Sequence, residues 1–299
     1  MAPLNVLVVN AGSTSLKLSL VRADGSAEPV DDFVAADAVG HRIVHMGDLA
    51  IDAALVEDWL LTYIEEGAEI APLHNRPALE ALDRAREALP GIPHVAVSDS
   101  QFHRTMTDEA RRYALPRDLG AIVRIGFHGL AVESVAEQVA GSRLVVCHLG
   151  GGCSVTAVRD GASMDTSMGY TPLEGPPMGT RSGSIDPGAL LHLLRSGVTV
   201  DALDRELNEE SGLKALGGLD DAFAFSHFTY HLAKAVAGMA SVLGGIDVLA
   251  FSGGIGENRA DVRDAVAGRL QHLGSFRVEA VHAREDFVIA RSVCRTLAA

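Results

Sequence analysis

Cysteine, tryptophan and lysine are scarce in this sequence of 299 residues. The three cysteines, Cys147, Cys153 and Cys294, show no Cys-x-x-Cys or other metal-ligand spacing, which argues against a zinc site and a disulfide framework. Such a sparse set fits a reducing compartment. No basic segment followed by an apolar stretch opens the chain, so we expect a cytoplasmic protein without a signal peptide.

Positive charge is also in deficit, with 39 Asp and Glu against 25 Lys and Arg and a formal net charge of −14. This balance argues against nucleic acid or an anionic membrane as a partner. The most apolar long segment, residues 223–251, contains charged residues and a Gly-Gly pair, which is typical of a buried helix, a turn and a strand. A small anionic substrate would need local positive charge against the overall field.

Two familiar nucleotide motifs are missing as well. No GxxxxGK[ST] sequence occurs, and no GxGxxG opens the chain, so a P-loop or a Rossmann domain is disfavoured. Polar residues at strand ends and in glycine loops are what remains to carry chemistry.

Two stretches of the chain are similar to each other. Residues 6–25 read VLVVNAGSTSLKLSLVRADG, and residues 144–161 read LVVCHLGGGCSVTAVRDG. Each has an apolar run, a break rich in Gly or Ser, an alternating run and a turn ending in Asp-Gly, which predicts a β-hairpin. Asn10 of the first stretch corresponds to His148 of the second. Duplicated hairpins whose turns expose backbone N–H groups suit an anion held between two halves.

Strands alternate with helices along the rest of the chain, which favours an α/β fold, and the length favours two domains. The apolar spacing predicts strands at 43–47 and 94–100 and helices at 51–66, 77–89, 131–140, 188–195, 200–207, 222–243, 259–273 and 284–297. Residues 21–39 are expected to form a link. Residues 165–187 are expected to form a long loop, and loops of that length are usually functional.

Three cations stand out as candidate anion ligands. Lys17, one of only three lysines, follows the first glycine turn; it suits either a solvated strand position or a contact with phosphate. Arg42 and Arg181 lie among small, uncharged neighbours. Each alone is typical of a surface arginine, but together they suit an anion clamp.

Acidic and imidazole side chains at strand ends and in tight loops are further candidates. Asp99 ends an apolar strand and is either a helix cap or a magnesium ligand or base. His74 and His128 lie beside Pro and Gly, where a packed structural histidine is the alternative to a functional one. Gly254 to Asn258 precede a predicted helix whose N-terminal N–H groups could bind phosphate or ribose.

The strings GHRIVHMG, APLHN, GFHG, CHLGGG, DTSMGYTPLEG, MGTRSGSIDP and SGGIGENR resemble segments that occur in the same order in acetate kinases. The resemblance covers nearly the whole chain. It implies the duplicated two-domain, ribonuclease H-like α/β fold of acetate and sugar kinases, heat-shock chaperone ATPases and actin. The expected N-terminal lobe is 1–100 plus 284–299, the C-terminal lobe is 101–283, and the active-site cleft lies between them.

The same resemblance implies a reaction, reversible phosphoryl transfer from ATP to acetate giving ADP and acetyl phosphate, with Mg²⁺ or Mn²⁺, in a homodimer. It implies catalytic roles for Asp99, His128 and Arg181, and contacts with the acid by Arg42, Val44, Leu73, His74, Phe127 and Pro172. It assigns nucleotide contacts to Lys17, His148, Leu149, Gly150, Gly151, Gly152, Gly254, Ile255, Gly256, Glu257 and Asn258. It assigns the metal to Asn10 and Glu285.

This sequence departs from the family pattern in places. The chain is shorter than typical members, mostly between residues 20 and 40 and after residue 218. The family's adenine contact is replaced by residues 219–222, and Gly151 stands where the family has Asn. The phosphate donor therefore stays open among ATP, GTP and pyrophosphate, and propionate rivals acetate. The alternative to an enzyme is a non-catalytic member of the family that binds a ligand through the former active site.

Overall fold

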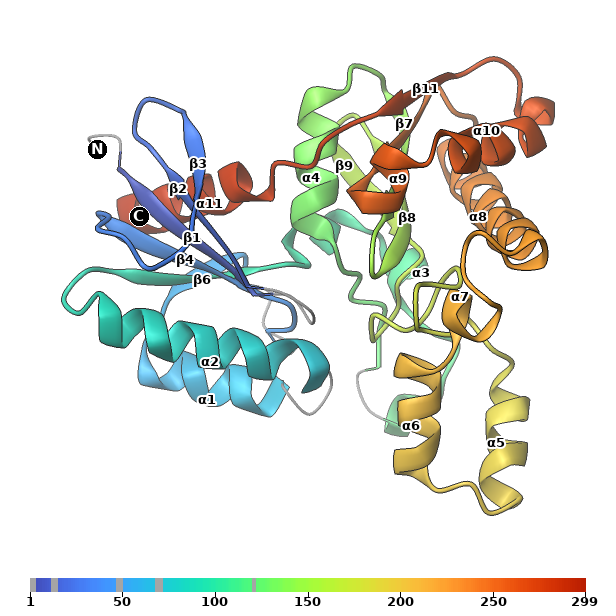
Figure 1. Cartoon of the computed structure of the whole chain (residues 1–299), viewed down its shortest axis with the longest axis horizontal. Coiled ribbons are helices and arrows are strands. Elements are labelled where there is room, and N and C mark those ends of the chain that lie inside the picture. Colours follow the sequence, from blue (N-terminus) through green and yellow to red (C-terminus); the bar gives the residue numbers. More distant parts are fainter. Residues whose placement is uncertain (1–3, 12–15, 47–50, 68–71, 120–121) are drawn as a thin grey trace. The chain divides into compact units, whose positions relative to one another are not determined.

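The structure is a computed structural model and describes residues 4–11, 16–46, 51–67, 72–119 and 122–299 (Figure 1). The chain divides into two compact units. The first comprises Met1–Arg104, Gly129–Ser134 and Arg284–Ala299, and the second comprises Thr105–His128 and Val135–Ala283. Each unit is built on one mixed β-sheet.

The first sheet has the strand order β3-β2-β1-β4-β6-β5. Its strands are β1 (Val6–Ala11), β2 (Leu16–Val21), β3 (Ala27–Val30), β4 (Ala38–Ile43), β5 (Ala53–Leu55) and β6 (His94–Ser98). The first three strands form an antiparallel meander, β4 and β6 continue parallel to β1, and β5 closes the edge antiparallel to β6. The first predicted hairpin is therefore confirmed as β1 and β2.

The second sheet has the order β11-β10-β7-β8-β9. Its strands are β7 (Arg143–Leu149), β8 (Cys153–Arg159), β9 (Ala162–Thr166), β10 (Val248–Ser252) and β11 (Arg277–Ala280). Again three strands form an antiparallel meander, and two more run parallel to the first of them. The second hairpin is confirmed, and apart from β5 the two sheets share one strand order, as the expected duplicated fold requires.

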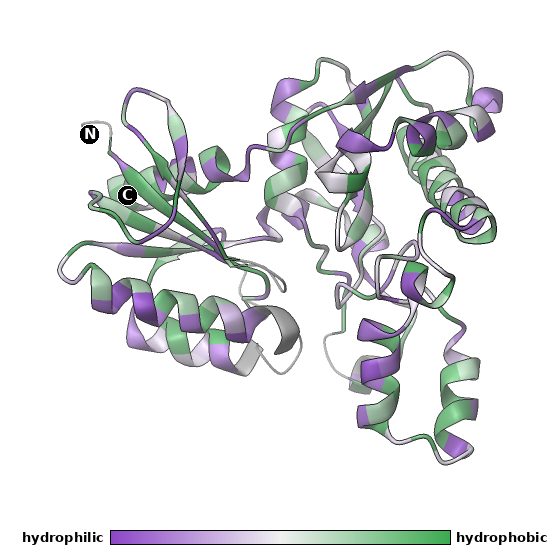
Figure 2. Ribbon diagram, in the orientation of Figure 1, coloured by the Kyte–Doolittle hydropathy of each residue, from purple (hydrophilic) through white to green (hydrophobic). Residues whose placement is uncertain are grey.

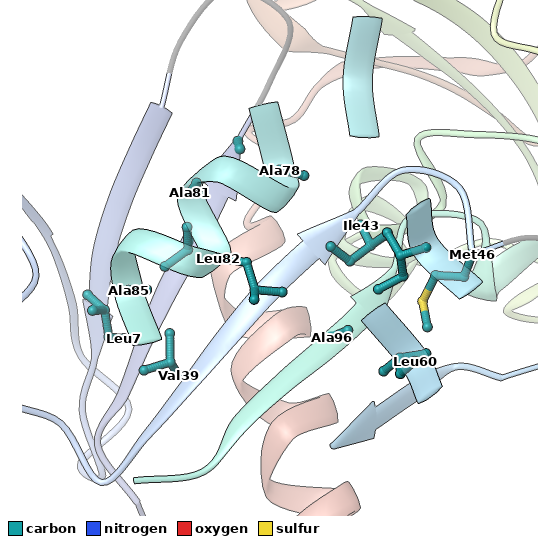
Figure 3. Close-up of a cluster of buried hydrophobic side chains, with 13 residues drawn as sticks. Leu7, Val39, Ile43, Met46, Leu60, Ala78, Ala81, Leu82, Ala85 and Ala96 are labelled. Carbon is teal, nitrogen blue, oxygen red and sulfur yellow. The ribbon is translucent and has the colours of Figure 1, made fainter. Parts of the chain in front are cut away.

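Helices cover both faces of the first sheet. Alternate residues of β1 face opposite ways, so Leu7 packs toward α1 (Asp58–Gly67) and α2 (Pro72–Ala88), whereas Val6 packs toward α11 (Glu285–Ala298). Figure 3 shows the first of these two cores, with Ala85 of α2 beside Leu7 and Val39 of the strands. Burial on both faces explains why the strand reads as one continuous apolar run.

Gly40 of β4 allows α11 to approach the sheet closely. A Cβ atom at this position would lie 2.7 Å from the methyl groups of Ile289 and Val293. A larger residue would push the helix away, and α11 carries a residue of the predicted metal site at its first position.

The second unit places α8 (Ala222–Leu243) against β7, β8 and β9. Asp221 caps this helix by accepting hydrogen bonds from the N–H groups of Phe223 and Ala224, and Gly244 ends it with φ +69°. Figure 2 shows hydrophobic residues along much of α8 and in the central strands of the first sheet. The remaining helices are α3 (Asp108–Arg111), α4 (Gly129–Gln138), α5 (Pro187–Arg195), α6 (Val200–Glu209), α7 (Gly212–Ala215), α9 (Gly253–Asn258) and α10 (Ala260–Arg269).

Several predicted elements were wrong. The strand expected at 43–47 lies earlier in the chain, where β4 ends at Ile43. The polar residues His41 and Arg42 concealed this strand in the sequence, although it pairs with β1 on one side and β6 on the other. The predicted helix at 51–66 is split into β5 and α1, and the predicted link at 21–39 contains β3 and the first two residues of β4. Strands β9 and β11 were missed. No helix of the described residues is both long and apolar enough to cross a membrane.

Candidate functional site

Four polar side chains of the first unit meet where its parallel strands end. Asn10 lies near the end of β1, Arg42 near the end of β4, and Asp99 directly after β6; Glu285 is the first residue of α11. Because β1, β4 and β6 are parallel and paired, their carboxyl ends share one edge of the sheet, which is where open α/β sheets bind ligands.

Hydrogen bonds link these four side chains one to the next. Arg42 donates from Nε and Nη2 to the two carboxylate oxygens of Asp99 at 3.0 and 2.9 Å, and from Nη1 to Oδ1 of Asn10 at 3.2 Å. Asn10 in turn donates from Nδ2 to Glu285 at 2.8 Å. We call Asn10, Arg42, Asp99 and Glu285 the carboxylate network.

The Arg42 guanidinium is held charged. Burial opposes its charge, but the carboxylates of Asp99 and Glu285 raise its pKa above the ordinary value. Its contacts with Asp99 and Asn10 use three of the five N–H groups of a guanidinium, so within the described residues two N–H groups remain for a further anion. The bidentate bond to Asp99, only 1% exposed, fixes the plane in which that anion must lie.

The pair predicted to bind the metal, Asn10 and Glu285, fits a hard cation because it offers an amide oxygen and a carboxylate. Mg²⁺ is usually held by one or two carboxylates plus water and substrate phosphates. The described part of the chain holds no group of three or more His, Cys, Asp and Glu that could bind a metal. Lys17 lies directly opposite Asn10 on β2, so its exposed side chain shares that face of the sheet.

Histidines replace carboxylates in the second unit. His128 precedes α4 with a left-handed backbone, φ +62°, and its Nδ1 lies 3.1 Å from the hydroxyl of Ser154. Its ring lies edge-on to that of His148 at 4.8 Å between centroids, and His148 Nδ1 lies 2.9 Å from Ser252 Oγ. A non-glycine residue at positive φ is uncommon and is often found at functional sites.

Gly152, in the turn between β7 and β8, brings His128 and Arg181 together. A Cβ atom there would lie 3.0 Å from the His128 ring and 3.3 Å from Nη1 of Arg181, so both side chains flank the same backbone. Arg181 is 7% exposed, its Nη1 donates to the carbonyl oxygen of Pro172 at 3.1 Å, and burial lowers its pKa. We call His128, His148, Gly152 and Arg181 the histidine group.

The predicted adenosine segment, Gly254 to Asn258, is not a loop before a helix. It forms the short helix α9, which the bare glycine pattern did not indicate. Gly253 begins α9 with φ +77° in close contact with the backbone of Leu149, so the two stretches predicted to bind nucleotide do lie side by side. Glu257 accepts from the N–H of Gly253 at 3.0 Å and contacts His282 at 2.9 Å.

The residues expected around the acid's alkyl group are divided between the units. Val44 is buried in the first unit, and Phe127 and Pro172 are buried in the second. The side chains of Leu73 and His74 lie outside the described residues.

Some residues of these groups escaped sequence reasoning. Ser154 and Ser252 contact the two histidines, and the signal for them was a hydroxyl residue inside an otherwise apolar strand. The altered segment after residue 218 also has a structural use. Asp220 pairs with Arg259 at 3.0 Å, and Asp221 caps α8.

Comparison with known proteins gives a consistent result. The family model described as the acetokinase family matches residues 31–294. An acetate kinase of Deinococcus deserti is 43% identical, covering 90% of this chain and 74% of the relative, and one of Synechococcus sp. is 40% identical, covering 93% and 80%. The crystal structure of a propionate kinase from Francisella tularensis superposes with a TM-score of 0.85 at 29% identity, covering 96% of this chain and 98% of the other.

Proposed function

The chain belongs to the acetokinase family, and from that membership we propose how its residues divide the work of one reaction. It is a short-chain carboxylate kinase, a phosphotransferase with a carboxyl group as acceptor. We propose acetate as the acid and ATP as the donor. The observation that carries the assignment of residues is the carboxylate network, which sets a charged, oriented guanidinium at the carboxyl ends of three parallel strands.

Arg42 binds the carboxylate of the acid. An acid anion attacks a polyphosphate poorly because the two repel each other, so a fixed positive charge must offset the repulsion. The two N–H groups of Arg42 beyond its bonds to Asp99 and Asn10 suit that task. In this proposal Asp99 acts by holding Arg42 charged and in one plane.

His128 and Arg181 stabilise the phosphoryl group during its transfer. Phosphoryl transfer passes through a loose, anionic transition state, so catalysis comes mostly from positioning and from positive or hydrogen-bonding groups. The position of both side chains beside Gly152 supports one joint role. Asn10 and Glu285 would hold Mg²⁺, which neutralises phosphate charge when bound.

The donor is bound by Lys17, by the turn from His148 through Gly152, and by α9. Backbone N–H groups of a glycine turn and of a helix start suit phosphate and ribose oxygens. Asp220 and Asp221 lie where the family has its adenine contact. Asp220 instead pairs with Arg259, and Asp221 caps α8. Selectivity among ATP, GTP and pyrophosphate should therefore be weak.

We propose acetate over propionate as the acid because the family resemblance implies it. One methylene is worth only about 1–3 kcal/mol, so propionate should also react. We further propose a homodimer, as the resemblance implies, and a cytoplasmic location, which the sparse cysteines favour.

The test is a panel of donors and acids. Acyl phosphate is trapped as hydroxamate after incubation with ATP, GTP or pyrophosphate and with acetate, propionate or butyrate, in the presence of Mg²⁺. We expect the largest kcat/KM for acetate with ATP. Product from none of the nine pairings, together with binding of nucleotide in calorimetry, would establish the non-catalytic alternative.

A further inference from the structure

One loop of the second unit, residues 167–175, contacts Arg181 directly and reaches His128 through the two residues Ile125 and Gly126 that lie shortly before it in the chain. The carbonyl oxygen of Gly169 accepts hydrogen bonds from the N–H groups of Ile125 and Gly126 at 3.0 and 3.2 Å, just before His128 in the chain. The carbonyl oxygen of Pro172 accepts from Arg181 at 3.1 Å. The loop is therefore hydrogen-bonded both to Arg181 and to the segment that leads into His128.

Arg124 holds the loop through its backbone. Its Nη1 lies 3.0, 3.2 and 3.1 Å from the carbonyl oxygens of Thr166, Ser167 and Met168, and its Nη2 donates to Glu174 at 3.0 Å. A charged guanidinium shared among carbonyls and a carboxylate forms stronger hydrogen bonds than neutral groups do. Three backbone carbonyls and one carboxylate thus bind the single guanidinium of Arg124.

Tyr113 completes the arrangement from another segment. Its hydroxyl donates to the second carboxylate oxygen of Glu174 and accepts from the N–H of Tyr170 at 3.2 Å. Burial, followed by the hydrogen bond to Glu174, raises the pKa of Tyr113 to about 12, so the phenol keeps its proton for that bond. Gly169 lies against both groups, because a Cβ atom there would overlap Glu174 and the Tyr113 hydroxyl.

We propose that Tyr113, Arg124 and Glu174, which we call the loop clamp, are positioning residues that fix His128 and Arg181 at the separation the transition state needs. The inference rests on the proposed roles of those two residues. Glu174 is the centre of the clamp because its two oxygens join Tyr113 to Arg124. Without the charge of Glu174, Arg124 loses the nearer of its two carboxylate partners, at 3.0 Å, and keeps Asp165 at 4.0 Å.

The experiment is a double-mutant cycle between Glu174→Gln and Arg181→Ala, with kcat and both KM values measured. Glu174→Gln keeps the size of the side chain and removes its charge. We expect kcat to fall about tenfold to a hundredfold, since displacements of about 1 Å can have that effect, while each KM changes less than about twofold. In the Arg181→Ala background the same change should lower kcat less than about twofold, because residues that act as a unit are not additive.

Asp247→Asn is the matched control. Asp247 pairs with Arg143 in the same unit, outside both the loop and the histidine group, and its loss should leave kcat unchanged. If Glu174→Gln prevents folding, Tyr113→Phe replaces it in the same cycle, with an expected fall of about threefold to tenfold for one hydrogen bond.

The outcomes separate the two ideas. An Arg181→Ala variant that retains full kcat overturns the role of Arg181 and the clamp with it. An impaired Arg181→Ala variant beside a fully active Glu174→Gln variant, or beside strictly additive losses, overturns the clamp alone.

Discussion

The strand order β3-β2-β1-β4-β6 of the first sheet returns as β9-β8-β7-β10-β11 in the second, but the connections differ. Residues 31–37 join β3 to β4 without a helix, whereas α5, α6, α7 and α8 intervene between β9 and β10. In the second unit α8 covers the sheet, and in the first unit α11, from the end of the chain, contributes one of the two covers. A sheet face needs an apolar cover, but the cover can come from any part of the sequence.

The polar groups at the two sites differ as well. The carboxylate network pairs a guanidinium with buried acid, whereas the histidine group surrounds a glycine turn with imidazoles, hydroxyls and Arg181. Asn10 and His148 occupy corresponding positions, next to last in β1 and β7. Equivalent strand ends can therefore carry side chains of different chemistry, because a fold fixes backbone positions and not side-chain identity.

The largest effect should come from breaking the ion pair of the first unit. Asp99→Asn leaves the buried charge of Arg42 without its carboxylate, and we expect the free energy of unfolding in urea to fall by about 3–5 kcal/mol. Glu28→Gln, at the exposed pair with Arg22, should cost at most about 1 kcal/mol. Equal losses for the two variants would mean that burial does not set the strength of this pair.

Arg181→Ala tests the second unit through activity. Removing one group that stabilises transition-state charge typically lowers kcat about 100-fold to 1,000-fold. Steady-state hydroxamate assays measure the change, and circular dichroism checks that the fold is kept. A fall in kcat smaller than about tenfold would contradict the assignment.

Acid should destabilise the first unit through His41. This side chain is buried and stacked on His94, and burial lowers its pKa to about 3. Because the folded pKa is depressed, its contribution is present above pH 6.5 and is lost as the pH falls from 6.5 toward 3. We expect a loss of about 2 kcal/mol between pH 7 and pH 5, measured by urea unfolding.

His41→Gln should reduce this dependence on pH, and His272→Gln, at an exposed position, should leave it as it is. A wild-type midpoint in urea that is the same at pH 5 and pH 7 would count against a buried neutral His41.

The smallest effect should come from adding one methyl group to the turn of the second unit. Gly152→Ala places a Cβ atom 3.0 Å from the His128 ring, so the ring must shift, and kcat/KM should fall about tenfold. Gly151→Ala, whose Cβ meets nothing within 4 Å, should keep its kcat/KM within about twofold. Similar losses in both variants would show that the turn backbone, and not the His128 contact, is responsible.

The sequence predicted the hairpins and the long helices well because their signals are local. The alternation in 144–161 and the apolar surface of 222–243 suffice to place β7, β8 and α8. It failed at β4 and β11, where a polar or short strand is defined only by the neighbours that pair with it. Hydrogen bonding across a sheet is a property of two segments, and neither contains the information alone.

The amino-acid sequence by itself determined the duplication, the α/β class, the family resemblance and the residue types available for the reaction, since each is written in local pattern or in motifs. Only the tertiary structure decided that Asn10 bridges Arg42 and Glu285, residues from opposite ends of the chain, and that Gly152 lies between His128 and Arg181. The reason is physical. The contacts depend on which strands pair and which helix covers them, and these choices minimise exposed apolar surface over each whole unit.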